Sequence, residues 1–204
     1  MEEYQAILFK IQSLVTSIGY RLEMRLVGET YIFYIYNGET EASNIQIGKT
    51  TGDIIVNKTR NQEKLNDHDV FNINTIFTNY EYRGQGLALL LLIYSICYLK
   101  IQFPEINYVT LDDESIRNVE INKNIYDSLG FAFQGTIKMN ISKTKKIELL
   151  DGPEKQLLID SEFIRRANYT LDTKFGRKGG KQKSRKSRKS RKSRKSRKSK
   201  KSRK

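Results

Sequence analysis

The stretch from Val70 to Leu99 constrains the fold of this chain more than any other. A β-rich run ends at Thr78, a six-residue turn with two glycines follows, and an uninterrupted apolar stretch of helical length begins. A strand that leads through glycines into a helix is suited to hold an anion, because the first N–H groups of a helix lack intrahelical partners and lie at the positive end of its dipole. The turn consists of Arg83, Gly84, Gln85, Gly86, Leu87 and Ala88.

The positive charge of the chain is confined to residues 177–204. The formal net charge is +14, but 18 of the 37 lysines and arginines lie in this segment, which contains no acid. Residues 1–176 therefore hold 19 basic and 23 acidic side chains and are mildly acidic. The segment 177–204 is a low-complexity series of Ser, Arg and Lys with no apolar residue to bury, which predicts disorder. We therefore expect one folded domain over 1–176 and a disordered basic tail over 177–204.

The sequence disfavours a disulfide-rich protein, a metal site, a secreted protein and a membrane-spanning protein. Cys97 is the only cysteine, so no intrachain disulfide framework is expected, and its place in an apolar run indicates a buried core thiol in a reducing compartment. The lone His68 is expected to be solvated, and we predict no metal site. The first residues are acidic where a secretory signal is basic, and the longest apolar run, 87–99, is too short for a membrane span. We expect an intracellular protein that is located in the cytoplasm or the nucleus. A viral protein located in its host cell would also fit this expectation.

The first third of the chain predicts one helix followed by an antiparallel meander. Apolar residues recur at helical spacing over 3–18, and Gly19 is placed to end that helix. Alternating and β-branched runs predict the strands, and turn-forming residues separate them. The expected strands are 20–27, 30–36, 42–48 and 53–56, with tight turns at 28–29, 37–38 and 51–52. The polar segment 58–67 is interpreted as a connecting loop.

The second half predicts a crossover between two neighbouring parallel strands. We expect a strand over 70–78, a helix over 87–100 closed by Pro104, a short buried strand over 106–111, and a helix over 115–129 that stops at Gly130. Such short joints imply a right-handed crossover. Further strands are expected at 131–141 and 146–150, and the pattern over 156–168 fits either a strand or a helix.

Two motifs in this half resemble those of a known family. The R-x-x-G-x-A pattern from Arg83 to Ala88 resembles the acyl-CoA motif of the GNAT superfamily of N-acetyltransferases. The hexapeptide from Tyr126 to Phe131 is similar to the Y-x-x-x-G-F that many members carry at the end of the second crossover helix. The resemblance covers roughly residues 20–150. It implies an α+β GNAT fold, with a mixed, mostly antiparallel twisted sheet, a splayed parallel strand pair and flanking helices.

The resemblance also implies acetyl-CoA as cosubstrate and assigns residues to its binding. Main-chain amides of the turn would cradle the pyrophosphate, and amides near the end of the preceding strand would hold the pantetheine arm and polarise the thioester carbonyl. The expected cofactor-binding residues are Phe77, Thr78, Arg83, Gly84, Gln85, Gly86, Leu87 and Ala88. Tyr126 is the expected general acid, since a phenol with a pKa of ~10 can protonate a departing thiolate.

The general base is left open by the sequence. Members that act on protein lysines often use a Glu on the strand before the glycine turn, whereas residues 71–75 contain no acid. Glu81, Asp112 and the two acids that follow Asp112 are candidates, and each is equally interpretable as a solvated loop acid or a helix N-terminal charge. A single helix precedes the meander where family members place two helices after the first strand. We therefore expect an unusually open acceptor site, or one built differently.

Two functional hypotheses follow. The first is an N-acetyltransferase in which a primary amine of a protein, peptide or small molecule attacks acetyl-CoA directly. The second is a catalytically degenerate domain that serves as a nucleic-acid-associated or virion-type binding protein through residues 177–204. Such a tail would bind nucleic acid by counterion release and, lacking aromatic residues, would not read its sequence. Lysines of the tail are themselves possible acetyl acceptors.

Overall fold

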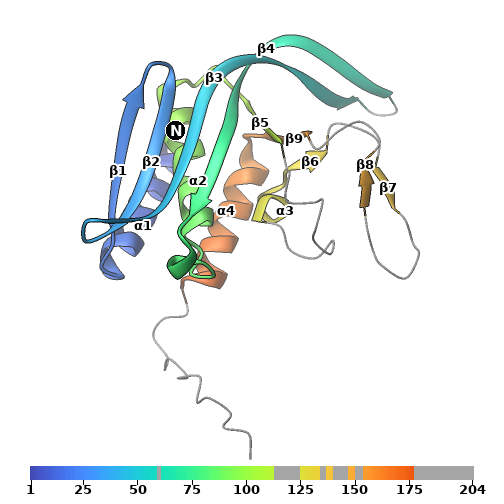
Figure 1. Ribbon diagram of the computed structural model, residues 1–204. Helices are drawn as coiled ribbons and strands as arrows, with labels where there is room; N and C mark the ends of the chain where they lie inside the picture. Colours follow the sequence, from blue (N-terminus) through green and yellow to red (C-terminus); the bar gives the residue numbers. More distant parts are fainter. Residues whose placement is uncertain (59–60, 113–124, 134–136, 140–146, 150–153, 177–204) are drawn as a thin grey trace, which may run out of the picture.

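The structure, a computed structural model, describes residues 1–58, 61–112, 125–133, 137–139, 147–149 and 154–176 (Figure 1). The predicted basic tail lies outside these residues. The helices are α1 Glu2–Ser17, α2 Leu87–Gln102, α3 Ile125–Leu129 and α4 Ser161–Lys174, with a 3-10 turn, η1, over Tyr80–Tyr82. The strands are β1 Arg21–Val27, β2 Thr30–Asn37, β3 Thr40–Lys58, β4 Asn61–Thr78, β5 Tyr108–Asp112, β6 Ala132–Phe133, β7 Ile137–Met139, β8 Ile147–Leu149 and β9 Glu154–Leu158.

The main sheet confirms the fold class expected from the sequence. Its described strands are ordered β1-β2-β3-β4-β5-β9-β6, and β7 pairs with β8 in a separate two-stranded sheet. The β4–β5 pair is parallel, and the other pairs of the main sheet are antiparallel. Helices α1, α2 and α4 lie behind the sheet in the view of Figure 1. The domain is thus α+β, with a mostly antiparallel sheet, one parallel pair and flanking helices.

The core lies between the sheet and helix α2. This helix is apolar almost all round, as expected of a helix that is covered on more than one side. Twelve of its residues are buried, and it packs against α1 as well as against the sheet. The sheet contributes inward-facing residues of β2 and β3 that are fully buried, among them Phe33, Ile35, Ile45 and Ile47. The first predicted helix and the helix after the glycine turn are confirmed by α1 and α2.

Cys97 lies within this core and is fully buried, as the sequence indicated. Burial raises the pKa of its thiol, because the low-dielectric interior disfavours the thiolate. We expect the native protein to resist Ellman's reagent, and the same protein to release one equivalent of thionitrobenzoate once unfolded in guanidinium. Rapid reaction of the native protein would show that α2 opens readily and would contradict this packing.

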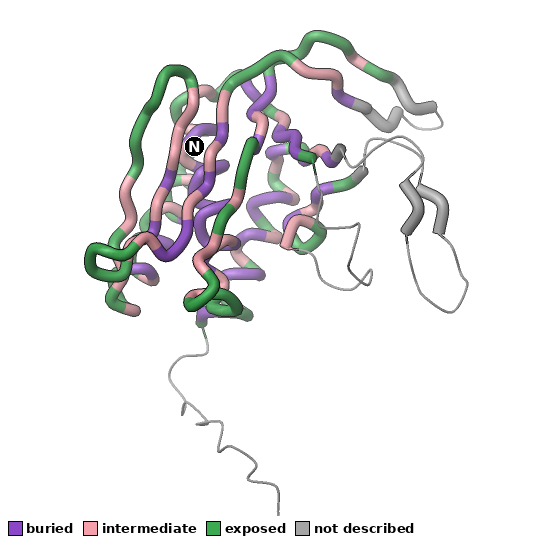
Figure 2. Tube along the Cα trace, in the orientation of Figure 1, coloured by how far each residue is buried: buried purple, intermediate pink, exposed green. Residues whose placement is uncertain are grey.

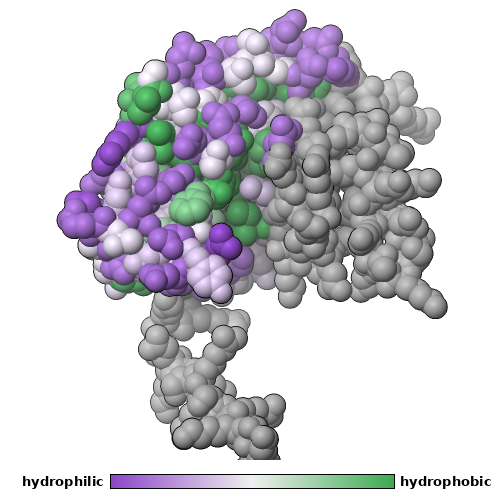
Figure 3. All heavy atoms as spheres, in the orientation of Figure 1, coloured by the Kyte–Doolittle hydropathy of each residue, from purple (hydrophilic) through white to green (hydrophobic). Residues whose placement is uncertain are grey.

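The described residues of the segment predicted to be a connecting loop, Lys58 and 61–67, belong to the strands β3 and β4 of a long hairpin instead. The described parts of β3 and β4 pair from Ser43 with Thr78 out to Lys58 with Asn61, so the expected strands 42–48 and 53–56 are one strand and the expected turn at 51–52 does not exist. Gly52 marks a register shift between β3 and β4, where Asp67 adopts a positive φ of 56°. Figure 3 shows hydrophilic residues along this arm. The polar residues Lys64, Asn66 and Asp67 are exposed to solvent, although they belong to a strand and not to a loop.

The C-terminal half differs from prediction in its boundaries. The expected strand 131–141 is not one strand, because β6 joins the main sheet and β7 pairs with β8. The undecided segment 156–168 contains both alternatives, since β9 ends at Leu158 and α4 begins at Ser161. Asp160 separates them: its side chain accepts hydrogen bonds from the N–H groups of Glu162 and Phe163 and so caps α4. Of the expected helix 115–129, residues 115–124 lie outside the described part, and α3 forms the remainder.

Candidate active site

Strand β4 parts from β5 just before the glycine turn. The described pairing between them runs from Phe71 with Val109 to Ile73 with Leu111, although β4 continues to Thr78. At this point Gln46 of β3 pairs with Thr75 and Ile47 pairs with Ile73, so Asn74 is an extra, bulged residue. A bulge bends its strand and turns backbone groups away from the regular ladder. Asn74 to Thr78 therefore extend β4 beyond its described pairing with β5, and β5 itself ends at Asp112.

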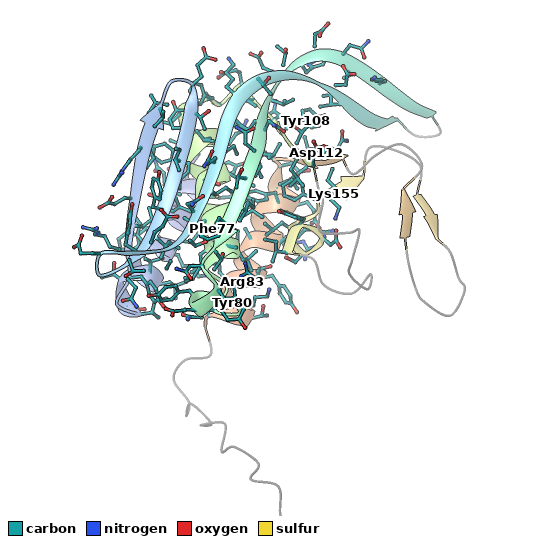
Figure 4. All side chains as sticks on the ribbon, in the orientation of Figure 1. Phe77, Tyr80, Arg83, Tyr108, Asp112 and Lys155 are labelled. Carbon is teal, nitrogen blue, oxygen red and sulfur yellow. The ribbon has the colours of Figure 1, made fainter. Side chains whose placement is uncertain are left out.

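The chain leaves β4 through η1, and Arg83 holds this exit in place. The Nε group of Arg83 donates a hydrogen bond of 3.2 Å to the carbonyl oxygen of Thr78. Its guanidinium lies over the ring of Tyr80, 5.7 Å from the centroid. Figure 4 shows Phe77, Tyr80 and Arg83 together at the end of β4, with Phe77 46% exposed. Arg83 therefore connects the strand end to the turn while its side chain remains at the surface.

Two glycines of the turn adopt backbone conformations that other residues rarely tolerate. Gly84 has a φ of 78° and Gly86 a φ of 84°. Gly86 is the N-cap of α2, and a Cβ atom there would lie 2.7 Å from Cζ of Phe175. A Cβ atom at Gly84 would meet nothing within 4 Å. Both positions require positive φ, but only Gly86 is also closed in by packing.

Gln85, between the two glycines, is attached to the first half of the chain. The hydroxyl of Tyr20 donates a 2.8 Å hydrogen bond to Oε1 of Gln85, and the ring of Tyr20 meets Tyr82 edge to face at 6.1 Å. Because the side-chain carbonyl of Gln85 is engaged in this way, the residue supports the shape of the turn. Nothing in the sequence indicated this contact with Tyr20, which is far away along the chain.

The turn opens into a pocket of about 260 Å³. Six of the eight expected cofactor residues line it: Thr78, Arg83, Gly84, Gly86, Leu87 and Ala88. Phe77 and Gln85 are outside the lining. Ile125 of α3 and Lys174 of α4 also contribute, and sequence reasoning missed both because their positions depend on how α3 and α4 pack. The N-terminal amides of α2, together with the cationic side chains of Arg83 and Lys174, make this pocket suitable for a phosphate-bearing ligand.

Tyr126, the expected general acid, lies on α3 next to the pocket-lining Ile125. Its ring meets Phe131 edge to face with centroids 5.7 Å apart, and Gly130 between them has a φ of 103°. The hexapeptide from Tyr126 to Phe131 thus folds back on itself at the end of α3. The phenol is half-buried, so the ring has a packed position while remaining accessible.

Lys155 is a buried cation beside Tyr126 that the sequence did not indicate. It lies on β9, is 1% exposed, and its Nζ group is 5.8 Å from the centroid of the Tyr126 ring. The same Nζ group donates a 2.8 Å hydrogen bond to Oδ1 of Asp127. A desolvated ammonium stabilises negative charge nearby, including charge that develops on a phenol when its proton leaves. Lys155 and Leu157 alternate on the inward face of β9, and this alternation was the available signal. The predicted segment began at residue 156 and so left Lys155 out.

The two candidate bases lie on different elements. Glu81 is exposed in η1, where its backbone N–H donates to the side chain of Asn79. Asp112 is exposed at the end of β5 and directly follows Leu111, the last described residue of β5 that pairs with β4. Asp112 therefore lies at the end of the described pairing between β4 and β5, whereas Glu81 flanks the turn. The two acids after Asp112 lie outside the described residues.

Over the described part of the chain, no group of three or more His, Cys, Asp or Glu side chains could hold a metal ion. His68 lies in β4 rather than in the expected loop, and it is exposed. No helix within the same residues has the length and apolar character needed to cross a membrane.

Comparison with known proteins finds similarity at the level of structures. No family model and no curated protein sequence matches this chain. Among solved structures, a ribosomal-protein alanine N-acetyltransferase from Escherichia coli is 17% identical, with 66% of this chain and 72% of that chain covered and a TM-score of 0.41. A bacterial toxin is 14% identical, with coverage of 71% and 73% and a TM-score of 0.47. A Desulfovibrio desulfuricans protein described as a GNAT-family acetyltransferase is 10% identical, with coverage of 75% and 92% and a TM-score of 0.41.

Proposed function

We propose that this protein is an acetyl-CoA-dependent N-acetyltransferase. The observation that supports this most is the continuity of the site: β4 leaves β5 after Ile73, and the freed strand end leads directly into the glycine turn and its pocket. A long, flexible ligand with a phosphate at one end and a reactive group at the other would bind the turn and extend along the last residues of β4. Acetyl-CoA has this chemistry.

In the proposed complex the turn binds the pyrophosphate. Main-chain N–H groups of Gly84 through Ala88 would donate to its oxygens, and Lys174 would add a cation from the opposite wall of the pocket. The pantetheine arm would run along residues 74–78 and hydrogen-bond to the backbone of β4. Since this recognition is mainly through the backbone, the turn requires small residues more than particular functional groups.

The proposed reaction is direct transfer without an acyl-enzyme. The lone pair of the amine attacks the thioester carbonyl carbon, the amine proton passes to a base, and the carbon–sulfur bond breaks. The phenol of Tyr126 gives its proton to the departing thiolate and is reprotonated from solvent, so the products are an amide and the CoA thiol. Asp112, acting directly or through a water molecule, is the proposed base because it lies at the end of β5, next to the last residue that pairs with β4.

Binding of the coenzyme is tested by thermal unfolding. Acetyl-CoA at ~100 times its dissociation constant is expected to stabilise the folded protein by about 2.7 kcal/mol, because a ligand that binds only the native state shifts the equilibrium by mass action. Pantetheine, which lacks the pyrophosphate, is the matched ligand and should give a much smaller shift at the same concentration. If acetyl-CoA causes no shift, the proposal fails at its first step.

The basic tail favours a second function, binding of nucleic acid. In that case a chain lacking residues 177–204 would lose salt-sensitive DNA binding while its response to acetyl-CoA would be unchanged. Strong DNA binding together with no acetyl-CoA response would favour the degenerate-domain hypothesis. Incubation of the full chain with acetyl-CoA, followed by mass spectrometry of the tail and of added amines and peptides, would show which amine accepts the acetyl group.

A further inference from the structure

Strand β1 is an edge strand of the main sheet among the described strands. It is the first strand in the sheet order, and Figure 1 shows it at the outer margin of the domain. All seven of its residues pair with β2 without a register shift. Proteins often protect such an edge with proline, a bulge, a very short strand or charged side chains; β1 has no proline and no bulge, and its charged residues are Arg21, Glu23 and Arg25. The described edge at the other end, β6, is only two residues long.

The backbone of β1 presents a regular row of unpaired groups on its free side. The hairpin turn at Gly28 and Glu29 is closed by the pair Val27 and Thr30. The closing pair of a two-residue hairpin is hydrogen-bonded, and hydrogen-bonded and non-hydrogen-bonded pairs then alternate along the strands. Leu22, Met24 and Leu26 therefore direct their N–H and C=O groups away from β2, toward the open edge.

The side chains at this edge are apolar on the face that carries the core. Leu22, Met24 and Leu26 pair with Ile35, Phe33 and Tyr31 of β2, which face the helices. Met24 is nonetheless 37% exposed and Leu26 56% exposed, because the helices do not extend over the edge. Figure 2 shows exposed residues along most of β1. Helix α1 contacts β1, and Leu22 packs against the core, whereas Met24 and Leu26 of the same apolar layer remain exposed at the edge.

The chemical sequence of β1 is self-complementary about Met24. Reading outward from Met24, an acid and a base stand on either side, Glu23 and Arg25, followed by a leucine on each side. A second β1 laid antiparallel, with a two-fold axis at Met24, would place Glu23 opposite Arg25 of the other copy, twice. Leu22 would face Leu26, also twice. Opposite charges and apolar pairs directly across two strands are favourable.

Alternative registers are disfavoured by the same residues. A shift of the pairing by one residue would place a residue from the core face of one strand opposite a residue from the solvent face of the other. Side chains alternate between the two faces of a strand, so this register is excluded. A two-fold axis at Glu23 would place two glutamates opposite each other and Arg21 opposite Arg25. An axis at Arg25 would place two arginines opposite each other. Of the pairings that overlap over most of the strand, only that centred on Met24 has complementary charges.

We propose that the protein forms a two-fold dimer in which β1 of one copy pairs with β1 of a second copy through Met24. The two main sheets then become one continuous sheet, and the contact is isologous. This proposal is independent of the acetyltransferase function, since β1 contributes no residue to the coenzyme pocket.

Charge reversal tests the interface, measured by size-exclusion chromatography with light scattering over a range of protein concentrations. Either Glu23→Arg or Arg25→Glu would place like charges together twice, and each is expected to raise the dimer dissociation constant at least about ten-fold. The double exchange Glu23→Arg with Arg25→Glu restores complementarity and should recover the dimer. Glu39→Arg, in the exposed turn between β2 and β3, is the matched control.

Glu23 and Arg25 also form an ion pair of 3.3 Å within one chain, so circular dichroism must first show that each single variant is folded. Glu39→Arg changes the net charge by the same amount as Glu23→Arg and controls for net charge. With both controls met, recovery in the double variant supports the proposal. The proposal is overturned if the unmodified protein is a monomer throughout the range, or if the single reversals dimerise as well as the Glu39→Arg control. It is also overturned if the double exchange is folded but remains monomeric.

Cysteine substitution tests the register. Met24→Cys places the new thiol opposite its own symmetry mate, within the Cα separation that a disulfide can bridge, and mild oxidation should yield a covalent dimer. Leu22→Cys would face Leu26 of the other copy and should remain monomeric on a denaturing gel. The buried Cys97 supplies no competing thiol. Equal cross-linking of both variants would overturn the proposed register.

Discussion

Replacing Gly86 by alanine is expected to abolish detectable binding of acetyl-CoA and to destabilise the domain. The residue has a φ of 84°, a conformation that costs an L-residue roughly 1–2 kcal/mol, and its new Cβ atom would lie 2.7 Å from Cζ of Phe175. The ring of Phe175 must therefore move. Phe175 is the C-cap residue of α4 and directly follows Lys174, which lines the pocket. The turn and the opposite wall of the pocket would therefore shift together. Calorimetric titration with CoA and thermal unfolding measure the two effects.

Two further variants separate the causes of this loss. Gly38→Ala has the same strain, with a φ of 58° and nothing within 4 Å of the new Cβ atom, but lies in the turn between β2 and β3. It should lose stability and keep CoA affinity. Adding Phe175→Ala to Gly86→Ala removes the ring that the methyl group would strike. If Gly86→Ala bound CoA as tightly as Gly38→Ala, the glycine turn would not be the coenzyme site.

Replacing Tyr126 by phenylalanine is expected to lower kcat by about 10²- to 10⁴-fold, the range that a general acid contributes. The ring would keep its packing against Phe131, so KM for acetyl-CoA and thermal stability should be nearly unchanged. A loss confined to kcat indicates an interaction made in the transition state rather than in substrate binding. Steady-state kinetics with the best acceptor from the amine screen provide the measurement.

Tyr80→Phe is the matched control for this experiment. It removes the same hydroxyl from a tyrosine that is 82% exposed beside the turn and leaves the ring under the Arg83 guanidinium. Its kcat should equal that of the unmodified protein. Equal rates for Tyr126→Phe and the unmodified protein would remove Tyr126 from the mechanism and leave water as the proton donor.

The parts of the fold that were predicted correctly are those specified by local patterns. The helix α2 and the strand before it are continuous apolar or β-branched runs, and the glycines between them leave few conformations to the turn. Short connections then required a parallel neighbour for β4, and β5 takes that place. Six of the eight residues expected to bind the cofactor line the pocket at the turn, and their role in binding remains a prediction.

The errors occurred where long-range pairing overrides local propensity. Residues 61–67 are mostly polar and contain no strand-like alternation, yet 61–65 pair with β3 because each strand supplies hydrogen bonds to the other. The segment from Glu154 to Lys174 combines a strand and a helix separated by two residues. Asp160 caps the start of α4 only two residues after β9 ends. The hydrophobic periodicity is averaged over a window longer than this junction, so it does not separate the strand from the helix.

The sequence by itself determined the glycine turn, the helix behind it and the parallel pair among the described strands, because these depend on glycine conformation and connection length, which are local properties. Only the tertiary structure decided what surrounds them. The ring of Phe175 against Gly86, the buried ammonium of Lys155 beside Tyr126, and the open edge at Met24 each join positions far apart along the chain or depend on which strand lies last in the sheet. Such contacts follow from how whole elements pack, and no local pattern encodes that packing.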